Sequence, residues 1–209
     1  MSKRDWFRKS SWTAADKKDF FDHLSRAKSP HSMAQYLRIQ ASHLQSDLKP
    51  PDPGAALELL DLMLKDHPDS SEVGMAHLQR AKCLEALNRH DEALYAYLRA
   101  VKADVNPFGI HTTDAPFHFA MFVIKHGLRR HHNDVLAALR GAEVAALMPE
   151  NQYRMCVAMA VIASENNQKK EASDYAKKAL RVAESLGASP GTIDAGIHRR
   201  VAGLADRPT

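Results

Sequence analysis

The chain has 209 residues, of which 44% are hydrophobic and 26% are charged, and its formal net charge is +4. This composition is typical of a folded globular protein and excludes an intrinsically disordered chain. The longest strongly apolar run, residues 119–124, is far shorter than the roughly 20 residues of a membrane span. The basic N-terminus lacks the apolar core of a signal peptide, so we expect a cytoplasmic protein without membrane association.

The first 33 residues differ from the rest because they contain both tryptophans, and we expect them to form an aromatic-rich N-terminal cap. Thr13, followed by Asp16 at the capping-box position, predicts a helix over about 14–27. Two interpretations of the aromatic residues stay open. Either they fold back on the first helix pair and cap it, or they anchor a partner protein. The residues concerned are Trp6, Phe7, Arg8 and Trp12.

From residue 34 onward, apolar residues recur with the period of a helix, and no alternating pattern indicates a strand. Proline and glycine clusters divide this region into helices, among which 52–68 begins beside Pro53 and ends at Pro68. In the segment 72–105, the sequence Asn88-Arg89-His90 predicts a turn between two helices. Two further pairs are expected over 114–146 and 150–186.

The helix pairs share a small or β-branched residue near the start of each second helix. These residues are about 37 to 42 positions apart, and they are Ala56, Ala93, Val135 and Ala172. After them, an amphipathic helix is predicted over 189–205, with Ile193, Ile197, Val201 and Leu204 on one face. This helix suits a C-terminal cap or a dimer contact.

Segment 72–105, with small residues at Ala81, Ala93 and Ala100, resembles a tetratricopeptide repeat (TPR), a helix–turn–helix unit of about 34 residues. It departs from the family pattern at His77, where Trp is usual, at Arg80, where Leu is usual, and at Val105, where Pro is usual. The resemblance implies an all-α, right-handed superhelix of about four antiparallel helix pairs, with capping helices at both ends. Its expected parts are a cap over 1–33, repeats over 34–188 and a capping helix with tail over 189–209, as one structural domain.

The resemblance also implies that the first helices of the pairs form a concave face that binds peptides. On this face we expect Gln35, Arg38, Ser42, Gln45, Gln79, Lys82, Glu85 and Arg154. The three cations among them would attract an acidic segment or a terminal carboxylate, if they are not ordinary solvated charges.

Histidine is unusually frequent, with twelve in the chain and five between His111 and His132. A metal site is one interpretation, but no HExxH, CxxC or HxxxH pattern occurs, so we expect no metal and no cofactor. No phosphate-binding loop or nucleophile motif is present, which predicts a protein that is not an enzyme. Cys83 and Cys156 lie in apolar helical patterns and are expected to be buried, reduced thiols.

We therefore expect a non-catalytic module that binds a protein or peptide, acting as a scaffold, adaptor, or immunity-type or regulatory binder. One alternative is a metal- or small-ligand-responsive sensor that uses the 111–132 histidines. Another is a weak nucleic-acid binder, against which the mixing of 29 basic and 25 acidic residues along the chain argues. The sequence leaves open whether the protein is a monomer or a homodimer.

Overall fold

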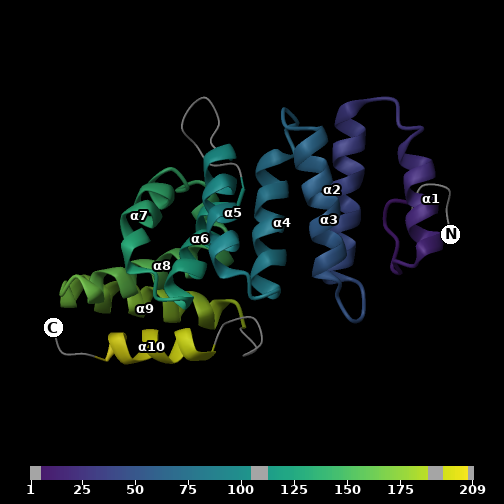
Figure 1. Cartoon of the computed structure of the whole chain (residues 1–209). Coiled ribbons are helices and arrows are strands. Elements are labelled where there is room, and N and C mark those ends of the chain that lie inside the picture. The colour runs from purple at the N-terminus through teal and green to yellow at the C-terminus, as the bar shows by residue number, and fades with distance from the viewer. Residues whose placement is uncertain (1–5, 105–112, 188–194, 207–209) are drawn as a thin grey trace. The chain divides into compact units, whose positions relative to one another are not determined.

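The computed structural model describes residues 6–104, 113–187 and 195–206. This part of the chain consists of helices and connecting turns and contains no strand, as expected of an all-α protein (Figure 1). The chain divides into two compact units, Met1–Asp104 and Val105–Thr209. No helix in the described ranges is long and apolar enough to cross a membrane.

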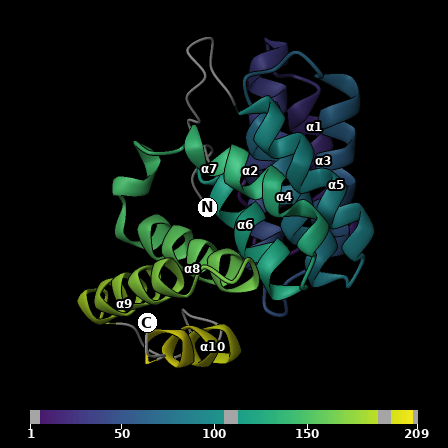
Figure 2. The ribbon, with the colours of Figure 1, turned by 90° about the vertical axis from the view of Figure 1, so that its left-hand side faces the viewer.

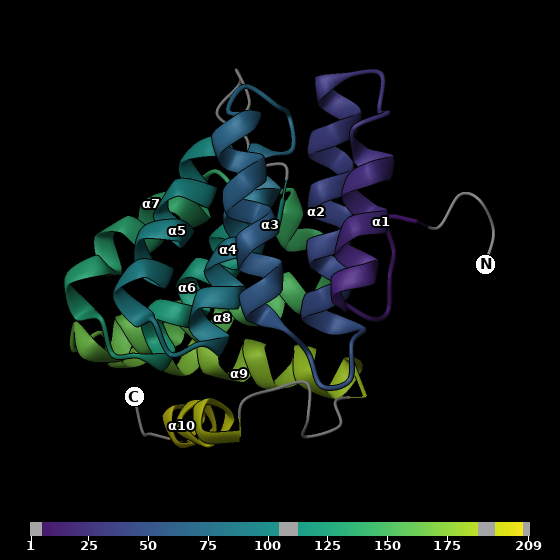
Figure 3. The same ribbon diagram turned by 45° about the vertical axis from the view of Figure 1, so that its right-hand side comes forward.

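In the first unit, the helices α2 to α5 pack on one another in chain order. The contacts join α2 to α3, α3 to α4 and α4 to α5, and Figure 3 shows α1, α2 and α3 side by side. The predicted pairing of neighbouring helices is therefore confirmed here. The helices are α1 (Ala14–Leu24), α2 (Pro30–Ser46), α3 (Pro53–Asp66), α4 (Val73–Ala86) and α5 (His90–Ala103).

Side-chain caps fix the starts of three of these helices. The Thr13–Asp16 capping box is present as predicted, the Ser29 hydroxyl accepts from the Ser32 amide, and Asp52 accepts from the Ala55 amide. The prediction of a first helix to residue 27 is wrong, because α1 ends at Leu24. The chain must turn before Ser29, which is extended (ψ 146°) ahead of Pro30 and starts the next helix.

The same turn recurs after the first helix of three pairs. In each, an amide donates to a carbonyl five residues earlier at 2.9–3.0 Å, from Arg89 to Leu84, Leu128 to Val123 and Gln168 to Ala163. The residue before each donor has a positive φ of 58–62°, and these residues are Asn88, Gly127 and Asn167. This is the Schellman end of a helix, which favours glycine or asparagine at that point. The same backbone turn therefore joins the two helices of three neighbouring pairs.

The expected small residues are buried between helices. Ala56, Ala81, Ala93 and Ala100 each have 0% exposure, which allows neighbouring helix backbones to approach closely. Tyr97, on the same helix as Ala93, is 2% exposed, and its hydroxyl donates to Glu85 at 3.0 Å. Val105, the expected departure at the end of this segment, lies outside the described residues.

The second unit contains the remaining two predicted pairs and the C-terminal helix. Here α6 contacts α7 and α8, α8 packs on α9, and α10 contacts both α8 and α9. Figure 2 shows the helices α8, α9 and α10 next to one another. On α10, the side chains of Ile197, Val201 and Leu204 are buried, while 189–194 lie outside the described residues. The elements are α6 (Ala115–Lys125), η1 (Arg129–His131), α7 (His132–Arg140), η2 (Ala145–Leu147), α8 (Pro149–Glu165), α9 (Lys169–Ser185) and α10 (Ala195–Ala205).

Candidate functional site

The residues predicted for a concave face occupy three helices. Those on α2 and α4 belong to the first unit, and Arg154 is on α8 of the second unit. All eight are half-buried rather than fully exposed. On α2 they are Gln35, Arg38, Ser42 and Gln45, and on α4 they are Gln79, Lys82 and Glu85.

Charge compensation within the chain weakens the case for a basic groove on these helices. The Arg38 guanidinium forms an ion pair with Glu72, immediately before α4, and their side chains are only 20% and 15% exposed. Glu85 accepts the Tyr97 hydroxyl bond. In the second unit, Arg154 Nη1 donates to the Asn151 side chain at 2.8 Å. Arg38 therefore links α2 to the start of α4 and does not offer an uncompensated charge to a partner.

A cavity of about 550 Å³ lies on another face of the first unit, where α3, α4 and α5 meet. We call it the α3–α5 pocket. Its principal lining residues are Asp61, Lys65, His77, Arg80, Tyr95 and Arg99. Two of them, His77 and Arg80, are the residues at which α4 departs from the TPR pattern. Polar side chains thus line a cavity at positions where that pattern has Trp and Leu.

The wall formed by α4 is polar and fixed. Arg80 Nε donates to Asp61 Oδ1 at 2.6 Å, which joins α4 to α3. The Nδ1 atom of His77 is buried and has no hydrogen-bond partner among the residues that the structure describes. Burial, with smaller contributions from Arg99 and Arg80, lowers the pKa of His77 to about 4 from its usual 6.5. The imidazole is therefore neutral at pH 7, and the positive charges of Arg80 and Arg99 disfavour its protonation.

The wall formed by α5 carries the exposed groups of the pocket. Tyr95 is 61% exposed, an uncommon state for a large aromatic side chain, and Arg99 follows it by one helical turn. At the rim, the Glu92 carboxylate accepts two hydrogen bonds from the Arg89 guanidinium, each of 2.7 Å. Within the described ranges, Arg99 and Lys65 form no ion pair, so they contribute available positive charge. Tyr95 and Arg99 were not predicted from the sequence. Their spacing of one helical turn on α5, together with the polar residues His77 and Arg80 on α4, was the signal that could have identified them.

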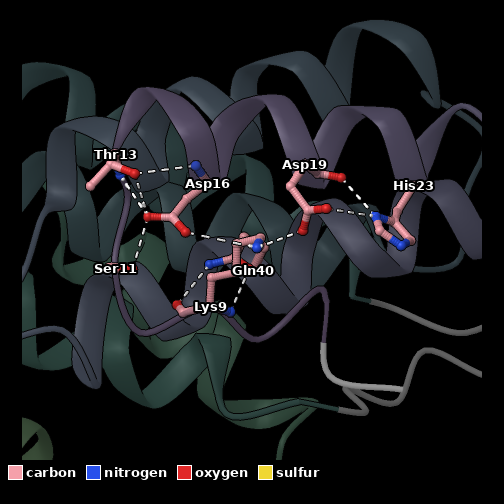
Figure 4. Close-up of polar contacts among 7 residues, drawn as sticks. All are labelled: Lys9, Ser11, Thr13, Asp16, Asp19, His23 and Gln40. Carbon is pink, nitrogen blue, oxygen red and sulfur yellow. Dashed lines mark hydrogen bonds and ion pairs between the residues drawn. The ribbon is translucent and has the colours of Figure 1, made fainter. Parts of the chain in front are cut away.

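The N-terminal segment is held to the first unit by a buried clamp, drawn in Figure 4. The backbone N–H of Lys9 donates to Gln40 Oε1 at 2.8 Å, and Gln40 Nε2 donates back to the Lys9 carbonyl at 3.0 Å. The Lys9 ammonium lies 2.7 Å from Asp19 and 3.8 Å from Asp16, both on α1. Since Gln40 has 0% exposure, this clamp is part of the core.

The aromatic residues of this segment pack on α1 and α2. The ring centroid of Trp6 lies 4.8 Å from that of Tyr36 and 5.3 Å from that of His23, with the His23 ring stacked. Phe7 lies 4.6 Å from Tyr36, and Trp12 meets Phe20 edge to face at 5.5 Å. The guanidinium of Arg8 lies over the Phe7 ring. These contacts pack the N-terminal segment on α1 and α2, and they leave Trp6, Phe7 and Trp12 half-buried.

The histidines of the second unit are distributed among separate acidic partners. His118 lies 2.9 Å from Asp114, His131 lies 2.8 Å from Asp134, and His132 lies 3.8 Å from Glu165. Among the described residues, no group of three or more His, Cys, Asp or Glu is placed to hold a metal ion. His111 lies outside them. The geometry therefore gives no support to the sensor interpretation.

Glu165 joins three elements of the second unit. Its Oε1 accepts from Arg200 Nη2 of α10 at 2.5 Å, and its Oε2 lies 2.9 Å from Arg129 Nε of η1, without hydrogen-bond geometry. The carboxylate is only 12% exposed. Its surroundings also affect His132, whose pKa is lowered chiefly by burial, against the opposing effect of Glu165. Arg129, in the turn before α7, is therefore paired with a carboxylate of α8 although its side chain is 75% exposed.

Both cysteines are free and fully buried. Burial raises the pKa of Cys83 to about 12, so its thiol is protonated and a poor nucleophile at pH 7. Cys83 and the neighbouring histidines thus lack the electrostatic environment of a thiol–imidazole pair.

Comparison with known proteins assigns no family to this chain. No family model matches the chain, and neither curated proteins nor solved structures show a significant similarity to it. Its function must therefore be inferred from the chemistry of its own surfaces.

Proposed function

We propose that this protein is a non-catalytic module that binds a protein or peptide, and that a side chain of the partner enters the α3–α5 pocket. In this proposal its helix pairs form a TPR-like right-handed superhelix. The observation that carries the binding site is the exposure of Tyr95 beside Arg99, above a cavity lined by His77 and Arg80. The recurring Schellman turns and the buried alanines support the TPR-like architecture.

The composition of the pocket suits a protein surface better than the predicted concave face does. Tyrosine and arginine are enriched among residues that dominate binding energy, because each offers a large contact area together with polar atoms. Tyr95 and Arg99 lie on a packed helix, so they lose little backbone freedom on binding. In contrast, Arg38 on the concave face must break its contact with Glu72 before it can pair with a partner.

The charges of the pocket favour an acidic partner residue. Asp61 is paired with Arg80, and Glu92 is paired with Arg89, whereas Arg99 and Lys65 form no ion pair among the described residues. A carboxylate that enters beside Tyr95 would meet Arg99 as a charge-assisted donor. Asp91 at the rim would oppose an extended acidic tract. The proposal therefore specifies one or a few acidic side chains rather than a polyanion.

The test is affinity co-purification with quantitative mass spectrometry, comparing the wild type with the Tyr95→Ala/Arg99→Glu variant. Both residues are exposed, so we expect the variant to keep its thermal stability while losing a specific partner by at least about tenfold. A Tyr175→Ala/Arg181→Glu variant, which changes the same residue types on α9 of the second unit, is the control and should retain the partner. A partner retained equally by both variants would exclude the α3–α5 pocket; loss with Lys82→Glu instead would move binding to the α2–α4 face.

A further inference from the structure

A second cavity in the first unit has an entirely different composition. It measures about 410 Å³ and lies where the N-terminal segment meets the end of α1 and the first turns of α2. We call it the Trp6 pocket. Its lining side chains are Trp6, His23, Arg26, Lys28, Ser32 and Tyr36, together with Ala27.

The charge of the Trp6 pocket is one-sided. No Asp or Glu is among its lining residues, whereas the α3–α5 pocket includes three. Arg26 and Lys28 are exposed, and neither forms an ion pair within the described part of the chain. Two carboxylates of α1 lie near the pocket and are paired within the protein, Asp22 with Lys18 and Asp19 with Lys9. Asp19 Oδ1 also lies 3.4 Å from His23 Nδ1, so it does not compensate Arg26 or Lys28. A cavity lined by uncompensated cations concentrates anions.

The polar groups of the pocket are oriented by contacts within the protein. Ser29 Oγ and Ser32 Oγ lie 2.9 Å apart, and the Ser32 hydroxyl can donate to another acceptor when Ser29 donates to it. His23 Nδ1 lies 2.8 Å from the Asp19 carbonyl oxygen, which fixes the ring that stacks on Trp6. The site thus combines one guanidinium, one ammonium and one hydroxyl donor beside two aromatic side chains.

The aromatic wall is fixed before any ligand arrives. Trp6 is three residues from Lys9, whose backbone is held on both sides by Gln40 (Figure 4). Its ring then contacts Tyr36 edge to face and His23 face to face. A wall held in this way costs a ligand little ordering entropy.

We propose that the Trp6 pocket binds a phosphate monoester, with Arg26 and Lys28 pairing with the phosphate oxygens and Ser32 donating a hydrogen bond. Three donors of different shape suit a tetrahedral dianion with three terminal oxygens better than a planar carboxylate with two. The organic part of the ester contacts Trp6 and Tyr36, which explains why a polar site has aromatic walls. This site is separate from the α3–α5 pocket and does not depend on the function proposed for it.

Trp6 itself supplies the measurement. In a Trp12→Phe variant, Trp6 is the only tryptophan, and its fluorescence is titrated with N-acetyl-phosphotyrosine amide and with adenosine monophosphate. The first probe represents a phosphorylated protein side chain and the second a free metabolite. N-acetyl-tyrosine amide and adenosine are the uncharged controls. We expect a saturable change with at least one phosphate ester and none with its uncharged counterpart, and the stronger ester identifies the source.

Three variants decide whether the named residues are responsible. Arg26→Gln/Lys28→Gln should weaken the binding of the ester by at least about tenfold. Lys169→Gln/Lys170→Gln removes two adjacent exposed charges from α9 and should leave it unchanged. Tyr95→Ala/Arg99→Glu should also leave it unchanged, so failure at one pocket is distinguishable from failure at the other. Equal weakening in all three variants would indicate non-specific charge attraction and overturn the proposal.

A second measurement protects the test against a folding defect caused by Trp12→Phe, since Trp12 packs on Phe20. In the wild-type protein, the two indole N–H signals are followed by NMR during the same titrations. We expect the Trp6 signal to move saturably and more than the Trp12 signal. The absence of any saturable shift with both esters up to about 10 mM, a concentration that would reveal even the weakest specific binding, would overturn the proposal.

Discussion

Replacing Gln40 by Met should destabilise the first unit through hydrogen bonding alone, because the two side chains have similar volumes. The substitution removes the bonds at 2.8 and 3.0 Å that satisfy the Lys9 backbone, in a region where Gln40 is 0% exposed. An unsatisfied buried backbone group costs about 1–3 kcal/mol, so the two together should cost about 2–4 kcal/mol after partial relaxation. The N-terminal segment relaxes by detaching from α2, which limits the loss.

The assay is urea unfolding of the full chain, followed by tryptophan fluorescence, with Gln45→Met as the matched control on the same helix. Gln45 is half-buried, and its side chain forms no hydrogen bond with the residues that the structure describes. Its replacement should therefore change the free energy of unfolding by less than about 0.5 kcal/mol. Gln40→Met should also shift the emission of Trp6 toward that of a hydrated indole. If Gln40→Met is as stable as Gln45→Met and its emission is unchanged, the clamp does not hold the segment.

Two further substitutions test the α4–α5 pair and the α3–α5 pocket. Ala93→Asp places a carboxylate at a position of 0% exposure, and we expect it to lower the free energy of unfolding in urea by at least about 4 kcal/mol. The control Ala137→Asp, at an exposed position of α7, should be nearly neutral. Normal stability of Ala93→Asp would refute the assigned packing. Because the pKa of His77 is lowered from 6.5 to about 4, the unfolded chain binds more protons between these values, so stability should fall as the pH is lowered from about 6.5 toward 4. His77→Gln should remove this part of the pH dependence, measured by urea titration at several pH values, and an identical pH profile in both proteins would contradict the burial of the imidazole.

The regular parts of this fold were predictable because they depend on local chemistry. Asn88 and the breaker sequences set the ends of helices through backbone preferences that act over a few residues. The apolar period and the small residues then predicted which neighbouring helices pack together. Ser29, Asp52 and the Thr13–Asp16 pair similarly start helices through contacts of only three residues.

The candidate sites were less predictable because they depend on contacts between distant residues. Gln40 has no sequence feature that connects it with Lys9, 31 residues earlier, and it was not recognised as a structural residue. Arg38 was predicted to face a partner, but its ion pair with Glu72 spans 34 residues. A separation of 34 residues is about the length of one repeat, so the two residues lie in neighbouring pairs. Aligning the repeats could therefore have suggested that they lie close together. Tyr95 was not predicted, because the TPR resemblance places binding on the first helix of each pair and Tyr95 lies on a second helix, α5.

The shared contacts of Glu165 have a consequence for the local dynamics of the second unit. Arg129 and Arg200 use the same carboxylate, although one precedes α7 and the other lies on α10. When α10 opens locally, Arg200 leaves Glu165, and the carboxylate keeps its contacts with Arg129 and His132. The fluctuations of these two segments are therefore thermodynamically coupled through one counterion, and a change at either arginine alters the opening equilibrium of the other.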